Sequence, residues 1–161
     1  VLRDTGLYHN PGDFGNLPAG EACLAPVEGT AEGILVIDRM GSIVTRPLKV
    51  IVRAGRAIRF EGPDAGKLEA LLRSADENAY NIAELGIGTN PKARLRGIVL
   101  EDEKVLGTVH VALGDNRSFP GGRVASSIHL DGVLLKPTLI VDGQVVMRDG
   151  RLLVSGQASG P

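Results

Sequence analysis

The stretch Leu48-Lys-Val-Ile-Val-Arg-Ala-Gly-Arg-Ala-Ile-Arg-Phe-Glu61 decides the fold class of this chain, because it holds two strand patterns joined by a tight turn. Residues 48–53 and 56–61 are rich in the β-branched and aromatic side chains that favour extended backbone. The dipeptide Ala54-Gly55 between them has the length of a two-residue hairpin loop. We therefore predict an antiparallel hairpin here, within a domain built mainly from β-strands.

One amphipathic helix is predicted directly after the hairpin. Leu68, Leu71 and Leu72 lie at positions i, i+3 and i+4, which places them on one helical face. Asp64, preceded by a proline, is a typical start signal. We place this helix at about residues 64–75.

The remainder of the chain predicts further strands and turns. A short helical turn is expected from Asn90 to Leu95, and Asp-Gly pairs at 142–143 and 149–150 predict hairpin loops. Further strand patterns lie at residues 33–38, 105–113, 128–135, 138–141, 144–148 and 151–154. The predicted fold class is α+β, a β-rich single domain of mostly antiparallel strands with one main helix.

The composition is that of a globular domain without extreme charge. Eighteen Lys and Arg oppose 19 Asp and Glu in 161 residues, and neither sign forms a long run, so no nucleic-acid or membrane partner is expected. The longest aliphatic run, residues 34–37, is far shorter than the ~20 residues that cross a bilayer. Cys23 is the only cysteine, which excludes an intrachain disulfide and favours a cytoplasmic location. Strands rich in Val and Ile after residue 130 favour a homodimer that covers their edges.

Two of the three histidines lie in strand patterns close to carboxylates. His129 and Asp131 are two residues apart, so on a strand their side chains share one face while Leu130 points to the core. His110 lies in the strand pattern 105–113. Imidazole and carboxylate groups that converge in one pocket are ligands for a divalent metal. Each histidine alone is as often structural, but the two together with Asp131 favour a metal site.

Three glutamates are further candidates. Glu84 lies in the apolar segment 82–88, and a buried carboxylate is costly unless it is paired or bound to metal. Glu21 follows a Pro-Ala-Gly turn that could point it inward. Glu103 precedes His110 by seven residues, so in one uninterrupted strand their side chains would lie on opposite faces.

Gly107 decides where Glu103 lies in this prediction. A β-bulge at Gly107 would return Glu103 to the face of His110, and without a bulge Glu103 would lie outside the pocket. The neighbouring Glu101 and Asp102 are expected to be solvated.

The loop of residues 114–122 joins the two histidine segments and would flank the predicted pocket. We expect Asn116 and Arg117 to contact substrate there, with an ordinary solvent loop as an equal alternative. The chain has no nucleophile elbow, Walker motif or complete dinucleotide fingerprint that competes with the metal hypothesis.

The order of five short segments resembles the aminopeptidase T and aminopeptidase S family of metallopeptidases. These segments are Asn16–Glu21, Ala83–Gly86, Asp102–Lys104, His110–Gly114 and His129–Asp131. The similarity spans residues 16 to about 150, and members of that family carry an additional N-terminal α/β domain. The resemblance implies that this chain is the C-terminal, metal-binding portion. Turn residues in the first 20 positions predict an irregular segment 1–20, which is followed by the metal-binding domain 21–156 and a tail 157–161.

The resemblance also implies a ligand set and an activity. The set would hold two divalent ions, such as zinc, cobalt or manganese, and consists of Glu21, Glu84, Glu103, His110, His129 and Asp131. The implied activity is that of an aminopeptidase, an enzyme that removes N-terminal residues from peptides through a metal-activated water. Glu84 is the candidate general base.

Two alternatives stay open. The same superfamily includes the similar 2,5-dihydroxypyridine dioxygenase, a ring-cleaving enzyme with one ferrous ion, and His110, His129 and Asp131 form the two-His-one-carboxylate set suited to iron. Two positions depart from the peptidases: Arg117 stands where they carry a tyrosine, and Glu103 is two residues farther from its histidine. The other alternative is a metal-stabilised scaffold without activity.

Overall fold

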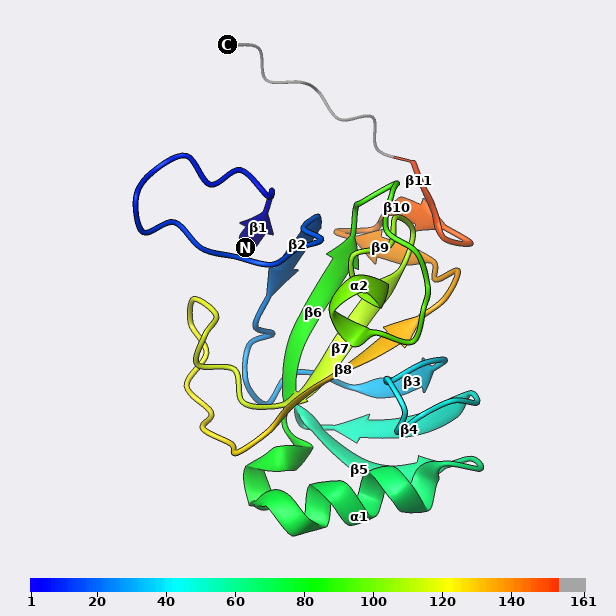
Figure 1. Ribbon diagram of the computed structural model, residues 1–161. Helices are drawn as coiled ribbons and strands as arrows, with labels where there is room; N and C mark the ends of the chain where they lie inside the picture. The colour runs from blue at the N-terminus through cyan, green and yellow to red at the C-terminus, as the bar shows by residue number, and fades with distance from the viewer. Residues whose placement is uncertain (154–161) are drawn as a thin grey trace.

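The computed structural model describes residues 1–153 and contains three antiparallel sheets and one long helix (Figure 1). The largest sheet has five strands in the order β1-β2-β6-β7-β8. Its strands are β1 (Leu2–Asp4), β2 (Glu21–Leu24), β6 (Ile82–Gly88), β7 (Val109–Gly114) and β8 (His129–Leu134). The predicted α+β class, with mostly antiparallel strands in a single domain, is confirmed.

The predicted hairpin forms the centre of a second sheet. Strands β4 (Leu48–Arg53) and β5 (Arg56–Glu61) pair antiparallel, and β3 (Gly33–Ile37) pairs with the other edge of β4. Ala54 and Gly55 have φ of 48° and 73°, the left-handed conformation that a tight hairpin turn of this twist needs. Helix α1 (Ala65–Ala75) follows, as predicted, and leads into the short 3-10 helix η1 (Glu77–Tyr80).

The third sheet consists of the predicted C-terminal strands. It contains β9 (Leu139–Val141), β10 (Gln144–Arg148) and β11 (Arg151–Leu152), joined by the two Asp-Gly turns. Residue 154 of the last predicted strand, the predicted domain end at 156 and the predicted tail lie outside the described residues.

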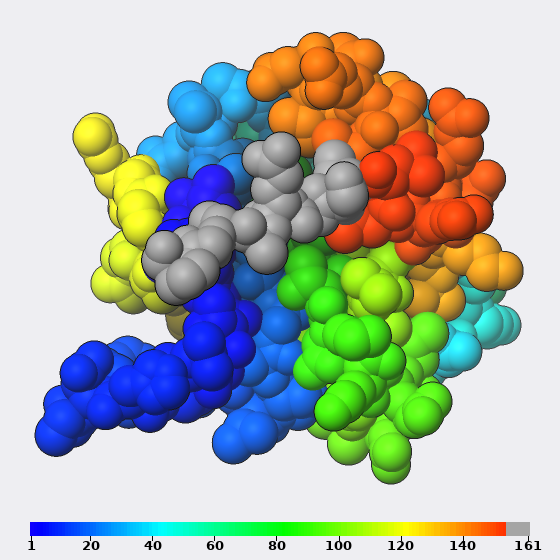
Figure 2. Space-filling model, turned by 90° about the horizontal axis from the view of Figure 1, so that it is seen from above, coloured from blue at the N-terminus to red at the C-terminus, as the bar shows by residue number. Residues whose placement is uncertain are grey.

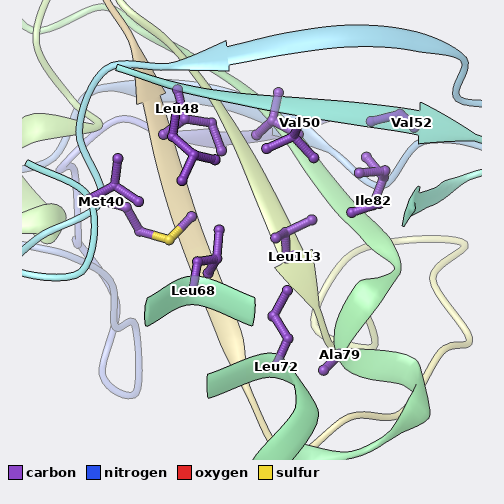
Figure 3. Packing of buried hydrophobic residues seen from close by; sticks show 13 residues of the cluster. Met40, Leu48, Val50, Val52, Leu68, Leu72, Ala79, Ile82 and Leu113 are labelled. Atoms are coloured by element: carbon purple, nitrogen blue, oxygen red, sulfur yellow. The ribbon is translucent and has the colours of Figure 1, made fainter. Parts of the chain in front are cut away.

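The hydrophobic core lies between the first two sheets and helix α1. Figure 3 shows Leu113 of β7 between Leu72 of the helix and Val50 of β4, and each of these side chains is at most 1% exposed. The helical spacing of Leu68 and Leu72 thus turns both into the core, as the sequence pattern predicts. This packing covers one face of the five-stranded sheet.

The second sheet is also joined to the first by backbone hydrogen bonds. The amide of Asp38, just after β3, donates to the carbonyl of Val133 on β8 over 2.9 Å. The amide of Val133 donates to the carbonyl of Arg39 over 2.7 Å. These bonds fix the edge strand β8 to the second sheet. The face of the five-stranded sheet that points away from the core remains free to carry other groups.

Three sequence predictions are wrong or incomplete. The segment 1–20 contains a strand, β1, which pairs with β2. Only Pro91 and Lys92 form a turn where a helical turn to Leu95 was expected. Asn90 Oδ1 accepts the amides of Lys92 (2.8 Å) and Ala93 (3.2 Å), as a helix cap does, but the chain does not continue into a helix.

The predicted strand 105–113 begins only at Val109, after a turn in which Gly107 has φ of 90°. Before that turn lies a short helix, α2 (Val99–Asp102), which the sequence analysis missed. Within residues 1–153, no helix combines the length and apolar character needed to cross a membrane.

Candidate metal centre

One face of the five-stranded sheet carries five of the six predicted ligands. Side chains of directly paired residues project to the same side of a sheet, and the register aligns Glu84, Ala112 and Asp131 in one row across β6, β7 and β8. In the next row, Gly86 pairs with His110. The ligands on this face are Glu21, Glu84, His110, His129 and Asp131.

Glu84 lies between the two imidazoles. Its Oε1 is 3.2 Å from His110 Nε2 and its Oε2 is 3.0 Å from His129 Nε2, and the residue is 4% exposed. Burial raises the pKa of this carboxyl, but the hydrogen bonds from both imidazoles outweigh it and lower the pKa to about 2. Glu84 is therefore an ionised carboxylate shared by two histidines.

The same contacts raise the pKa of the two histidines. Burial lowers the pKa of His110, but the carboxylates of Glu21 and Glu84 outweigh it and raise the pKa to about 10. Burial likewise opposes the charge on His129, while Asp131 and Glu84 raise its pKa to about 11. Both imidazoles hold a proton here that a metal ion would displace from the nitrogen it binds.

His129 is oriented by a backbone carbonyl. Its Nδ1–H donates to the carbonyl oxygen of Asp115 over 2.7 Å, which directs Nε2 toward Glu84 and toward Asp131 Oδ1 at 3.4 Å. The ring of Phe119 stacks on the imidazole with centroids 5.8 Å apart and an interplanar angle of 27°. A carbonyl behind one nitrogen commonly prepares the other nitrogen to bind a metal.

Two glycines make room for the site, and their role was not predicted from the sequence. A Cβ at Gly86 would collide with the His110 imidazole, and one at Gly88 would lie 2.6 Å from Thr108 Oγ1 and 2.8 Å from the carbonyl oxygen of Glu103. Glu84, Gly86 and Gly88 alternate along β6 and so share one face. The Glu-x-Gly-x-Gly spacing was the signal that could have revealed this.

Glu103 reaches the site by a different route from the predicted one. It caps the C-terminus of helix α2 in a helical conformation, and Gly107 lies in the turn before β7, so no bulge in a continuous strand is involved. Asp102, expected to be solvated, is 1% exposed because its carboxylate accepts the amides of Arg96 (2.7 Å) and Gly97 (3.0 Å). A helix and a turn thus replace the strand on which the parity argument depended.

Lys104 is a member of the cluster that no sequence signal revealed. It is fully buried, its Nζ lies 2.7 Å from Glu21 Oε1, and it also forms an ion pair with Glu103. Burial and the nearby charge of Asp131 raise the pKa of Glu103 to about 7, against the opposing effect of the Lys104 ammonium. A buried ammonium needs such carboxylate partners, because desolvating an unpaired charge is costly.

The donor set fits a divalent metal ion. Three overlapping groups each offer ligand atoms within 4.8 Å of one another: Glu21, Glu84 and His110; Glu84, His129 and Asp131; Glu103, His110 and Asp131. Glu21 Oε2 and Asp131 Oδ1 are buried and have no hydrogen-bond partner among the described residues. Buried carboxylate oxygens of this kind, beside imidazole nitrogens, match the ligand chemistry of zinc, iron and manganese.

A large cavity opens above this cluster. It has a volume of about 880 Å³, and five of the six predicted ligands line its floor: Glu21, Glu84, Glu103, His129 and Asp131. The N-terminal segment, with Tyr8, and the loop after β7, with Phe119, line it. Figure 2 shows both segments, blue and yellow, projecting from the same side of the molecule. The volume suits a small organic molecule or the end of a peptide.

The structure places the two predicted substrate-binding residues apart from the six ligands. Asn116 is fully buried, and its Oδ1 accepts the amide of Val124 over 2.8 Å, which holds the loop together. The Arg117 side chain is 60% exposed and pairs with Asp115 at 2.7 Å. The cavity lining from this loop consists instead of Ser118 and Phe119.

Two solved structures share this fold. 2,5-Dihydroxypyridine dioxygenase from Pseudomonas putida KT2440 matches with a TM-score of 0.72 and 23% identity, over 82% of this chain and 43% of that one. AmpT (aminopeptidase T) from Thermus thermophilus matches with a TM-score of 0.68 and 22% identity, over 86% of this chain and 41% of that one. The chain therefore spans less than half the length of either protein.

The family comparison agrees with these structural matches. No curated protein sequence matches the chain significantly. Residues 1–154 match the family model described as NicX: 2,5-dihydroxypyridine 5,6-dioxygenase. The chain belongs to the 2,5-dihydroxypyridine 5,6-dioxygenase family.

Proposed function

We propose that this chain forms the metal-binding part of a dioxygenase that opens a hydroxylated aromatic ring, such as a dihydroxypyridine, with one ferrous ion. The observation that carries the proposal is the position of Asp131. This carboxylate belongs both to the group with His129 and to the group with His110, so each imidazole has a nitrogen within 4.8 Å of an Asp131 oxygen. Family membership supports the same reaction class.

The residues around the ion would have separate tasks. His129 and Asp131 would hold the ion at the cavity floor, with His110 as the third ligand. An iron ion held by two imidazoles and one carboxylate would have open positions, and it would supply the chemistry by which dioxygen reacts with the substrate ring. Neutral imidazole nitrogen is the ligating form, so both histidines would lose a proton on loading.

Glu84 would serve as the proton acceptor of the site. In the structure its two oxygens accept hydrogen bonds from His110 and His129. Once the imidazole nitrogens face an ion, Glu84 Oε2 is left as an ionised, buried carboxylate at the cavity floor. It could then take the proton from a ring hydroxyl, a transfer that a carboxylate within hydrogen-bond reach can perform.

The walls of the cavity suit a planar ring. Phe119 already stacks on the His129 imidazole, and Tyr8 lines the opposite segment of the cavity. Aromatic faces bind another ring by offset stacking, which adds about 0.5–1.5 kcal/mol beyond the burial of apolar area. The N-terminal segment and the loop after β7 would exclude water from the substrate.

Oxygen uptake tests the proposal. Protein loaded anaerobically with Fe(II) should consume dioxygen when 2,5-dihydroxypyridine is added, and mass spectrometry with labelled dioxygen should find both labelled atoms in the product. His129→Ala should lose at least 99% of the rate. His9→Ala is the matched control, because His9 is exposed and belongs to none of the ligand groups, and it should keep the full rate.

Aminopeptidase activity is the second candidate. It is favoured by the group of Glu21, Glu84 and His110, which lies beside the group at the cavity floor and could hold a second ion. Release of leucine from a short peptide in the presence of zinc, cobalt or manganese, without oxygen uptake on any dihydroxypyridine, would establish it in place of the dioxygenase.

A further inference from the structure

The buried Lys104 ammonium divides the ligand cluster into two unequal parts. Within the described chain its hydrogen bonds go to Glu21 and Glu103. Each of these glutamates belongs to one of the two ligand groups that include His110. The remaining group, Glu84, His129 and Asp131, contains neither partner of the lysine.

Lys104 is held in this position by the backbone as well as by its charge. The amide of Asn90 donates to the carbonyl of Lys104 over 2.8 Å, and the Asn90 side chain donates to the carbonyl of Ala19 over 2.7 Å. The same asparagine therefore ties Lys104 to the segment just before Glu21. These contacts fix the backbone from which the Lys104 side chain extends, and the ion pairs with Glu21 and Glu103 hold its ammonium.

The charge balance explains what such a lysine does. Glu21 and Glu103 are at most 9% exposed in their side chains, and two buried carboxylates so close together need a cation between them. In a two-ion site that cation is a divalent metal. Here the ammonium satisfies one oxygen of each glutamate, and a second divalent ion would meet a fixed positive charge at a few ångströms.

We propose that Lys104 is a built-in cation that takes the place of a second divalent ion, so that the site holds a single ion at Asp131 and the two histidines of the proposed function. This inference rests on the metal site of the proposed function, but not on the ring-cleaving reaction. It assigns Lys104 a positioning role, because the ammonium contacts the glutamates and not the ion.

Counting bound ions tests the inference directly. Purified protein saturated with Mn(II) or Zn(II) and freed of excess metal should contain one ion per chain by elemental analysis. Lys104→Met, which keeps the length of the side chain but removes its charge, should contain two. In the Mn(II) form the variant should also show the spin coupling of a neighbouring pair in its electron paramagnetic resonance spectrum.

Two control variants separate charge from general disturbance. Lys104→Arg keeps the positive charge and should keep one ion per chain. Lys92→Ala removes an exposed lysine and should also keep one. Circular dichroism should show that each variant is folded, and if Lys104→Met folds only with metal, two equivalents and not one should be needed.

The outcomes are distinct from a failure of the proposed function. Two ions in the unchanged protein, or a folded Lys104→Met with one ion, would overturn the role of Lys104 while leaving a metal enzyme in place. No bound ion in the unchanged protein would instead remove the metal site itself, and with it the proposed function.

Discussion

Gly86 on β6 lies directly opposite His110 on β7, and the His110 imidazole fills the space that a Cβ at position 86 would need. The fully buried histidine can therefore approach Glu84 and Glu21 only because its cross-strand neighbour has no side chain. A backbone requirement on one strand thus determines the geometry of an imidazole on the next.

Gly86→Ala should weaken metal binding at least tenfold, because the methyl group displaces the His110 ring from Glu84. Competition with a metal-binding chelator dye measures this affinity. Gly66→Ala is the control, since nothing lies within 4 Å of a Cβ at that position of α1. The control should leave metal affinity unchanged and raise stability by up to about 1 kcal/mol through helix propensity. Unchanged affinity in Gly86→Ala would show that His110 is not a ligand.

Phe119→Leu should weaken the binding of an aromatic ligand about 3- to 10-fold, because it removes a ring that stacks at the cavity floor. Metal content should stay the same, since Phe119 offers no ligand atom. Isothermal titration of the metal-loaded protein with 2,5-dihydroxypyridine measures the first quantity and elemental analysis the second. Equal affinities in both proteins would place the ring-binding surface elsewhere.

The Asp76 carboxylate anchors the loop that carries Phe119, and the stability that this anchor contributes should depend on pH. Its carboxylate accepts the amide (2.7 Å) and hydroxyl (2.8 Å) of Ser127 and the hydroxyl of Ser126 (3.0 Å), and these hydrogen bonds lower its pKa. The unfolded chain therefore binds this proton more tightly than the folded one. The contribution to stability is complete above about pH 4, the ordinary range of Asp, and is lost as the pH falls through the lowered pKa.

The melting temperature of Asp76→Asn should consequently be lower than that of the unchanged protein at pH 7. The difference between the two melting temperatures should shrink steadily below about pH 4. A difference that is the same at pH 7 and pH 3 would mean that the charge of Asp76 does not anchor the loop.

Leu72→Ala should lower the free energy of unfolding by about 2–5 kcal/mol, because it leaves a cavity in the packed core. Leu72 is 0% exposed and lies against Leu113 in Figure 3. Denaturant titration measures the loss. Leu71→Ala, the same change at a partly exposed position of the same helix, should cost clearly less. Equal losses would contradict the burial difference between these neighbours.

Much of the fold followed from short-range patterns. The hairpin at 48–61, helix α1 and the Asp-Gly turns depend on side-chain periodicity and on residues that accept left-handed backbone, both of which act over a few positions. The shared face of His129 and Asp131 follows from the same rule, since a strand alternates its side chains. The apolar segment around Glu84 and the turn before Glu21 made both glutamates candidates, and the family resemblance placed them in a ligand set.

The position of Glu103 could not be obtained in this way. A strand was expected across residues 105–113, but the strand begins only at Val109, and helix α2 and a turn precede it. That helix is held by contacts such as the amides of Arg96 and Gly97 on the Asp102 carboxylate, which a strand pattern does not reveal. Side chains alternate between two faces only along one continuous strand, and Glu103 does not lie in a strand.

The burial of Lys104 could not be predicted from neighbouring residues in the sequence. Strand faces, turns and candidate ligands were available from the order of residues, because they depend on neighbours along the chain. The burial of Lys104 depends on Glu21, 83 residues away, and on the pairing of β2 with β6 that brings Glu21 into the cluster. A lysine in a charged segment is normally solvated, and only the tertiary structure could surround it with the carboxylates that make its burial stable.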